Sequence, residues 1–219
     1  MRKRLVITID GPSGAGKSTM AKFLASALGY SYLDTGAMYR AVAYAYARGP
    51  DPSDLELFLR DLVLHFVFDT QTQVFLDGED ISRHIRTPEI SLLASRLSQD
   101  PRVRRYLTKM QRDMGKDGGV VLEGRDTGSV VFPDAEVKFF LDADVNERAR
   151  RRHVELAARS AGDDLGKVKE EMQKRDRDDS ERDIAPLIRP EGALYVDTTG
   201  LDIAHVVRIL EERVKEAMP

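Results

Sequence analysis

Residues 11–18 read GPSGAGKS and fit the pattern G-x-x-x-x-G-K-[ST] of a phosphate-binding loop. Glycines let the backbone curl so that successive N–H groups face phosphate oxygens, and a helix that starts after the loop adds a favourable dipole. Lys17 would then reach the β- and γ-phosphates of a nucleotide, and the Ser18 hydroxyl would be placed for Mg²⁺. The pattern therefore predicts a nucleoside-triphosphate site.

A phosphate-binding loop leaves three classes of protein open: a kinase, a nucleotide-driven motor and a GTPase-type switch. The guanine-specificity motif N-K-x-D is absent from the chain. A kinase needs a second site for its acceptor, and arginines are what an anionic acceptor would require. The residues expected to bind the triphosphate are Gly11, Pro12, Ser13, Gly14, Ala15, Gly16, Lys17, Ser18 and Thr19.

Residues 174–183 read KRDRDDSERD, with nine charged side chains in ten positions. Such a run is usually a solvated helix face with weak ion pairs, and a site for a charged ligand is the alternative. On a helix, Arg175, Asp179 and Arg182 share one face. We expect that face to line a site, while solvent-facing partners would be Asp176, Asp178, Glu181 and Asp183.

The elements that must position these residues alternate between strand and helix patterns. Apolar runs predict buried strands, and apolar residues at helical spacing predict the helices between them. This alternation predicts an α/β fold with a doubly wound parallel sheet of about five strands. The predicted strands are 4–10, 30–33, 118–126, 135–144 and 193–199; the predicted helical segments are 17–28, 34–48, 88–115, two Arg-rich helices on either side of 160–164, and 201–217.

Residues 62–86 break this alternation. The short runs HFVF and QVFL are typical of strands, and the polar tetrad DTQT separates them. The segment predicts a small antiparallel insert at one edge of the molecule.

The composition limits the functions that the chain could have. It has 219 residues, 42% hydrophobic and 32% charged, which suits one α/β domain with a small insert. A net charge of −3 argues against a broad nucleic-acid-binding face, and the lack of cysteine excludes thiolate chemistry. No apolar stretch is long enough to span a membrane, and the N-terminus lacks a signal-peptide pattern. We expect a cytoplasmic monomer with no nucleic-acid or membrane partner.

Several sequence blocks in this order resemble the bacterial cytidylate kinases, which belong to the nucleoside monophosphate kinase family of P-loop proteins. The resemblance runs through nearly the whole chain. The blocks that carry it are ITIDGPSGAGKST (7–19), LDTGAMYRA (33–41), IRTPEIS (85–91), ASRLSQDPRVR (94–104), EGRDTGSVVFPDA (123–135), KFFLDA (138–143) and KRDRDDSERDIAPL (174–187).

The resemblance implies a P-loop core, a nucleoside-monophosphate-binding insert and a short helical lid. The core would comprise residues 1–60, 100–145 and 186–219. The insert would span 61–99, and the lid with its flanking Arg-rich helices 146–185.

The resemblance also implies roles for single residues. Thr35 and Arg40 would lie near the acceptor monophosphate, and Ser95, Arg104 and Asp126 near the cytosine ring. Arg125 would reach the acceptor phosphate. On the charged helix, Arg175 and Asp179 would meet the ribose hydroxyls, and Arg182 would approach base and phosphate. The implied CMP-binding residues are thus Thr35, Arg40, Ser95, Arg104, Arg125, Asp126, Arg175, Asp179 and Arg182.

The implied reaction is phosphorylation of CMP and dCMP by ATP with Mg²⁺, with Lys17, Arg125 and Arg182 as the catalytic residues. Ser18 is the expected metal ligand, and Asp34 is the candidate for the carboxylate that P-loop proteins usually place beside the metal. Two alternatives remain open: a kinase for another small acceptor such as UMP or AMP, and a nucleotide-gated binding protein without enzymatic activity.

Overall fold

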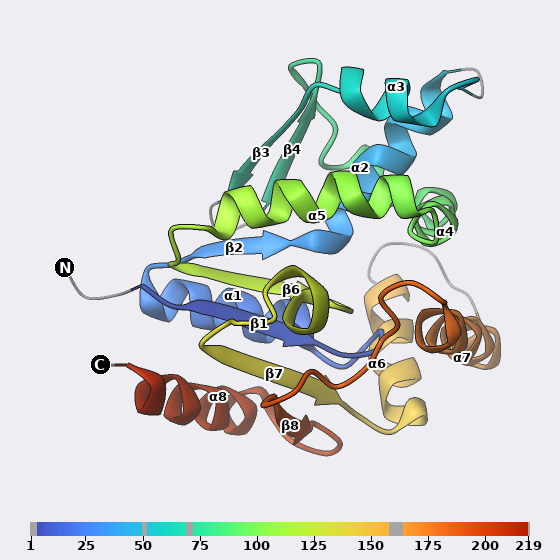
Figure 1. Ribbon diagram of the computed structural model, residues 1–219. Helices are drawn as coiled ribbons and strands as arrows, with labels where there is room; N and C mark the ends of the chain where they lie inside the picture. Colours follow the sequence, from blue (N-terminus) through green and yellow to red (C-terminus); the bar gives the residue numbers. More distant parts are fainter. Residues whose placement is uncertain (1–3, 50–51, 69–71, 158–163, 219) are drawn as a thin grey trace.

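The computed structural model describes residues 4–49, 52–68, 72–157 and 164–218. Its centre is a five-stranded sheet in the order β2-β6-β1-β7-β8, and every pairing in it is parallel (Figure 1). The strands are β1 (Val6–Asp10), β2 (Ser31–Asp34), β6 (Val120–Gly124), β7 (Val137–Asp142) and β8 (Leu194–Asp197). This confirms the predicted doubly wound parallel sheet.

The register brings the carboxyl ends of three strands to one level. Asp10 of β1 pairs with Gly124 of β6, and Asp34 of β2 pairs with Glu123 of β6. Open parallel sheets bind ligands beyond this edge, because the helices that follow the strands start there. Asp10 and Asp34, the last residues of β1 and β2, and Glu123, one residue before the end of β6, therefore lie at the same edge of the sheet.

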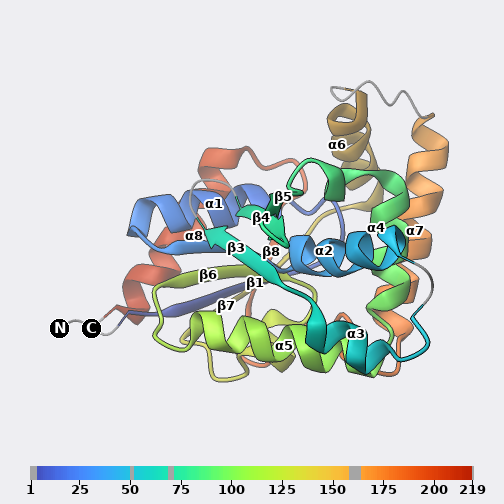
Figure 2. The ribbon, with the colours of Figure 1, turned by 90° about the horizontal axis from the view of Figure 1, so that it is seen from above.

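Helices cover both faces of the sheet (Figure 2). α1 (Lys17–Leu28) and α8 (Ile203–Ala217) pack on one face, around a core that includes Ile7, Leu24 and Phe139. α2 (Thr35–Arg48) and α5 (Pro101–Gly115) enclose the other core, which includes Met38 and Leu107. Strands buried on both faces explain the uninterrupted apolar runs in the sequence.

The predicted antiparallel insert is present at one edge of the molecule. It contains β3 (Leu64–Phe68), β4 (Thr72–Leu76) and the two-residue β5 (Glu79–Asp80), paired in that order. Residues 69–71 of the predicted DTQT tetrad lie outside the described residues. The short helix α3 (Leu55–Asp61), which precedes β3, was not predicted from the sequence. A 3₁₀ turn (His84–Arg86) and α4 (Pro88–Leu97) return the chain to α5.

Two helices lie at the carboxyl edge of the sheet, beside the tips of the strand arrows in Figure 1. They are α6 (Val145–Ala157) and α7 (Leu165–Glu181), the two Arg-rich helices expected from the sequence. Residues 158–163, which include most of the segment expected between them, lie outside the described part of the chain. No helix in the described ranges combines the length and the apolar character that a membrane crossing needs.

Candidate active site

The phosphate-binding loop joins β1 to α1. Gly11 has φ 146°, and a Cβ there would lie 1.9 Å from the Leu141 carbonyl oxygen, so only glycine fits. Gly16 caps α1 in the left-handed conformation, and no side chain of the described residues caps this end of the helix. The N–H groups of the first turn could therefore bind an anion, and binding of a triphosphate there stays a prediction from the sequence pattern.

Lys17 is the first residue of α1 and is 7% exposed. Its Nζ donates a hydrogen bond to the Pro12 carbonyl oxygen at 2.6 Å. Burial, with the nearby Arg125 guanidinium as the next cause, lowers the pKa of Lys17 to about 7. The carboxylates of Glu123 and Asp10 act in the opposite direction but do not offset these causes.

Glu123, near the end of β6, is the carboxylate that contacts the loop. The Ser18 hydroxyl donates to its Oε2 at 2.7 Å, and the Tyr32 hydroxyl donates to its Oε1. Burial raises the pKa of Glu123. Asp34, the residue expected in this place, instead caps α2 through the Ala37 N–H at 2.8 Å and pairs with Arg40 at 3.0 Å.

A second group of charged side chains follows β6 and connects three elements. Arg125 Nε donates to Asp179 Oδ2 of α7 at 2.8 Å, and Arg104 of α5 donates to Asp126. Arg182, the residue that caps the end of α7, lies 3.6 Å from Asp179 and 3.8 Å from Asp126. Arginines and aspartates thus alternate along one network, and all five of its members were predicted site residues.

Three more of the predicted acceptor residues lie on α2, α7 and α4. The buried Thr35 hydroxyl donates to the Glu123 carbonyl oxygen at 2.7 Å. Arg175 is half-buried on α7, and its Nε has no hydrogen-bond partner among the described residues. Ser95 is half-buried on α4, one turn before Ser98, whose carbonyl oxygen accepts from Arg104 at 3.0 Å.

The outer residues of the charged segment differ from expectation at one position. Asp178, Glu181 and Asp183 are exposed, as predicted. Asp176 is half-buried and pairs with Arg148 of α6, so its assignment as a solvent-facing residue is wrong. Arg148 also donates to the Ser13 carbonyl oxygen at 3.1 Å, which links α7 through α6 to the phosphate-binding loop.

The site gathers more buried positive charge than its carboxylates neutralise. Burial lowers the pKa of Lys17, and Arg125 and Arg175 lower it further. Burial also lowers the pKa of Arg175 to about 10, with Arg125 as the next cause and Arg40 as a smaller one. Cations that are held this close favour the binding of anions, which would relieve their mutual repulsion. The arrangement can therefore hold two phosphate-bearing ligands side by side.

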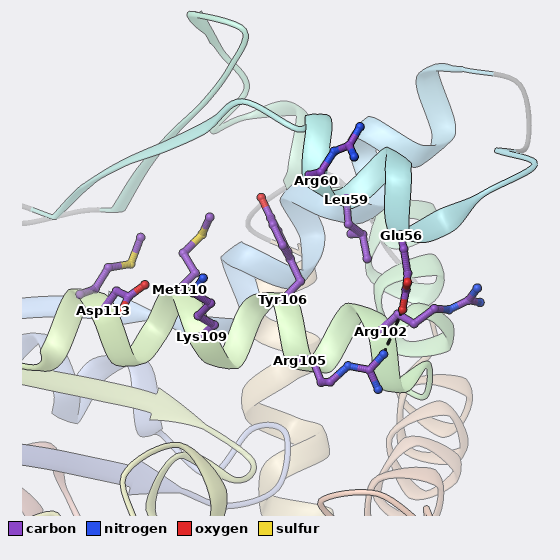
Figure 3. A pocket seen from close by; sticks show the side chains of 10 residues that line it. Glu56, Leu59, Arg60, Arg102, Arg105, Tyr106, Lys109, Met110 and Asp113 are labelled. Atoms are coloured by element: carbon purple, nitrogen blue, oxygen red, sulfur yellow. Dashed lines mark hydrogen bonds and ion pairs between the residues drawn. The ribbon is translucent and has the colours of Figure 1, made fainter.

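A separate cavity of about 660 Å³ lies between α3 and α5 (Figure 3). It is lined by Leu59, Tyr106 and Met110, with the ion pair of Arg105 and Glu56 at its side (3.1 Å). None of the predicted site residues lines it, so it is not part of the charged site.

Comparison with known proteins supports the resemblance found in the sequence. The chain matches the family model described as Cytidylate kinase over residues 7–216. A cytidylate kinase of Geobacter sp. strain M21 is 49% identical, over 98% of this chain and 94% of the relative. A cytidylate kinase of Geobacillus sp. strain WCH70 is 44% identical, over 99% of both chains.

Among solved structures, a gluconokinase from Sinorhizobium meliloti aligns with a TM-score of 0.50 and 17% identity, over 99% of this chain and 95% of that chain. An uncharacterized protein from Eubacterium ventriosum aligns with a TM-score of 0.55 and 11% identity, over 97% of this chain and 99% of that chain. At this level of identity the alignments bear on the fold alone.

The lowered pKa of Lys17 leads to a prediction about proton uptake. At pH 8, above its pKa of about 7, Lys17 is mostly neutral, and a bound triphosphate favours its charged form. We expect binding of Mg²⁺-free ATP to take up most of one proton per site at pH 8 and much less below pH 6, where Lys17 is already charged. Calorimetric titration in two buffers with different ionisation enthalpies measures this uptake.

The control for this prediction is Lys17→Arg, because a guanidinium stays protonated throughout this pH range. The uptake at pH 8 should disappear in this variant. Equal uptake by both proteins would show that another group binds the proton.

Proposed function

This chain belongs to the cytidylate kinase family, and from that membership we propose that it transfers the γ-phosphoryl group of ATP to the 5′-phosphate of CMP or dCMP. The products are ADP and the corresponding diphosphate. The phosphate-binding loop at residues 11–19 receives ATP, and the charged network beyond β6 receives the acceptor.

One observation supports this assignment above the others: Arg125 of the network lies close enough to Lys17 of the loop to lower its pKa, after burial as the larger cause. A motor or a switch needs a cationic loop for its nucleotide but has no need of a second buried arginine cluster next to it. A kinase that brings two anionic reactants together needs both the cationic loop and the arginine cluster.

We propose that the acceptor phosphate binds between Thr35, Arg40 and Arg125. Arg40 Nε has no hydrogen-bond partner among the described residues, so the guanidinium that pairs with Asp34 keeps a donor for a ligand. Arg175 and Asp179 would contact the ribose hydroxyls. Arg175 likewise carries an unpartnered Nε within the described chain.

For the base, we propose that Ser95, Arg104 and Asp126 recognise cytosine. Asp126 is 7% exposed and Arg104 4% exposed, so any hydrogen bond that they lose is costly. A carboxylate accepts from the exocyclic amine of cytosine, whereas uracil presents a carbonyl oxygen there. Arg182, which lies between Asp126 and Asp179, would approach both the base and the phosphate.

The residues beside the loop suit Mg²⁺. The described residues contain no group of three or more His, Cys, Asp or Glu that could hold a metal by themselves. Mg²⁺ usually takes only one or two protein ligands and completes its shell with water and substrate phosphates. We propose that the Ser18 oxygen is the protein ligand and that Glu123 orients it. When bound with ATP, the ion neutralises charge on the β- and γ-phosphates.

Catalysis in this proposal consists of positioning and charge stabilisation. Lys17, Arg125 and Arg182 would hold both reactants in line and stabilise the charge on the phosphoryl group as it passes between them. We further propose that the insert (61–99) and the lid (146–185) close over the reactants and exclude water, which would otherwise compete as acceptor. That the enzyme acts as a monomer in the cytoplasm remains a prediction from the sequence.

The function is tested by ADP release from ATP and Mg²⁺ with CMP, dCMP, UMP, AMP or no acceptor. We expect rapid turnover with CMP and dCMP, slow turnover with UMP and very little without an acceptor. Lys17→Met should reduce turnover with CMP by roughly 100-fold or more, since a charge contact to the transferred group is lost. Turnover that does not depend on the acceptor would contradict the kinase assignment.

Base recognition is tested by Asp126→Asn, which keeps the size of the side chain and removes its charge. The ratio of kcat/KM for CMP to that for UMP should fall by about tenfold or more, because the pairing with Arg104 and the acceptor for the amine both weaken. Steady-state kinetics with the two nucleotides measures this ratio. An unchanged ratio would remove Asp126 from base recognition.

The metal assignment is tested by Glu123→Gln, which weakens the acceptor for the Ser18 hydroxyl. Turnover should fall about 10- to 100-fold, and the Mg²⁺ concentration for half-maximal rate should rise. Asp34→Asn serves as the comparison, because Asp34 pairs with Arg40 and should affect the KM for CMP rather than the Mg²⁺ requirement. A shift in the Mg²⁺ requirement only in the Asp34 variant would restore Asp34 as the carboxylate beside the metal.

A further inference from the structure

Asp10 is a fully buried carboxylate at the end of β1, directly before the phosphate-binding loop. Its Oδ1 accepts from the Thr127 N–H and the Thr127 hydroxyl, both at 2.8 Å. Its Oδ2 accepts from the Gly128 N–H at 2.7 Å. All three donors belong to the short π-helical turn Thr127–Val131 that follows Asp126.

The Thr127–Val131 turn is not capped by the side chain of the residue that precedes it. Asp126 precedes its first residue, the place from which an aspartate usually caps a helix, yet the Asp126 side chain makes no cap hydrogen bond. That side chain is directed to Arg104 and Arg182 instead. Asp10 supplies the missing cap from the neighbouring strand, so Asp126 can pair with Arg104 instead of capping the turn.

The carboxylate of Asp10 connects the two substrate sites. In the chain, Asp10 is followed directly by Gly11, the first residue of the phosphate-binding loop. Through its hydrogen bonds it also fixes the residue that directly follows Arg125 and Asp126. Burial raises the pKa of Asp10 to about 6, although all three hydrogen bonds favour the charged form. The three hydrogen bonds thus favour the ionised form of Asp10 at a position where burial disfavours it.

We propose that Asp10 is a positioning residue for the acceptor nucleotide. It holds the consecutive residues Arg125 and Asp126 at a fixed distance from the phosphate-binding loop. This inference rests on the proposed function, since it concerns the binding of CMP beside ATP. A displacement of about 1 Å at such a site can cost on the order of 100-fold in rate. Loss of the Asp10 contacts should therefore appear in acceptor binding and base selection before it appears in ATP binding.

Kinetics of Asp10→Asn tests the inference. An amide offers one oxygen and turns an N–H group toward the remaining donor, so the cap is broken while the shape is kept. We expect the KM for CMP to rise about tenfold or more and the CMP-to-UMP preference to fall, with the KM for ATP within about twofold of the parent value. Equal increases in both KM values would overturn the inference, as would a lower melting temperature with unchanged kinetics.

Thr127 provides a matched pair of variants, which decides the matter if Asp10→Asn does not fold. Thr127→Val removes one of the three hydrogen bonds, and Thr127→Ser retains it. The valine variant should raise the KM for CMP several-fold, and the serine variant should stay near the parent value. If both variants match the parent, Asp10 does not position the acceptor through this turn.

Thr8→Val is the control on the same strand. The buried Thr8 hydroxyl has no hydrogen-bond partner within the described part of the chain, so its removal should leave both KM values unchanged. The parent enzyme separates the two hypotheses. If it does not phosphorylate CMP, the proposed function is wrong; if it does and the Asp10 and Thr127 variants behave like it, only the inference about Asp10 is wrong.

Discussion

Repulsion between buried cations is the constraint on which the site depends. Lys17, Arg125 and Arg175 converge at one edge of the sheet. Burial lowers the pKa of both Lys17 and Arg175, and the charge of Arg125 lowers both further. Such a cluster is stable in a folded protein only when carboxylates separate the charges. Asp179 contacts both Arg125 and Arg182, and Asp126 contacts both Arg104 and Arg182. Each aspartate is therefore shared by two arginines, which leaves positive charge for the phosphates of two substrates.

Parallel strand pairing is what brings these residues together. The segments that carry Lys17, Arg125 and Asp179 are far apart in the sequence, yet each begins or ends at the carboxyl edge of the sheet. The register places Asp10 beside Gly124, so the start of the ATP loop and the turn that carries Arg125 lie on adjacent strands. Helix α7 completes the site from outside the sheet. Its position is fixed by Asp179, which pairs with Arg125, and by Asp176, which pairs with Arg148.

Patterns of neighbouring residues in the sequence predicted the strands and the phosphate-binding loop, because both depend on residues that are close together in the chain. The central strands β1, β6 and β7 were recognisable because they are buried almost throughout, and the phosphate-binding loop because its glycines and Lys17 have fixed spacing. The resemblance to a known family supplied the acceptor residues, five of which form one network. Glu123 was missed, because in the run VVLEG it looks like part of a buried strand and its partner Ser18 is 105 positions earlier in the chain. The error at Asp176 has the same origin: its partner Arg148 belongs to another helix, and no local pattern shows how α6 and α7 pack.

The end of β6 has a particular part in this arrangement, because it contacts both of the proposed substrate sites within four residues. Glu123 accepts from Ser18 of the ATP loop, whereas Arg125 and Asp126 pair with α7 and α5. The backbone between them is held from two sides: Thr35 donates to the Glu123 carbonyl oxygen, and Asp10 accepts from Thr127 and Gly128. Gly124 has no room for a side chain here, since a Cβ would lie 2.6 Å from Thr127 Cγ2 and 2.7 Å from Thr35 Oγ1. Phosphoryl transfer needs two reactants at a fixed separation, and a rigid strand end meets that need better than contacts between mobile parts. In the proposed mechanism, closure of the insert and the lid would then have to exclude water but not to set the distance between donor and acceptor.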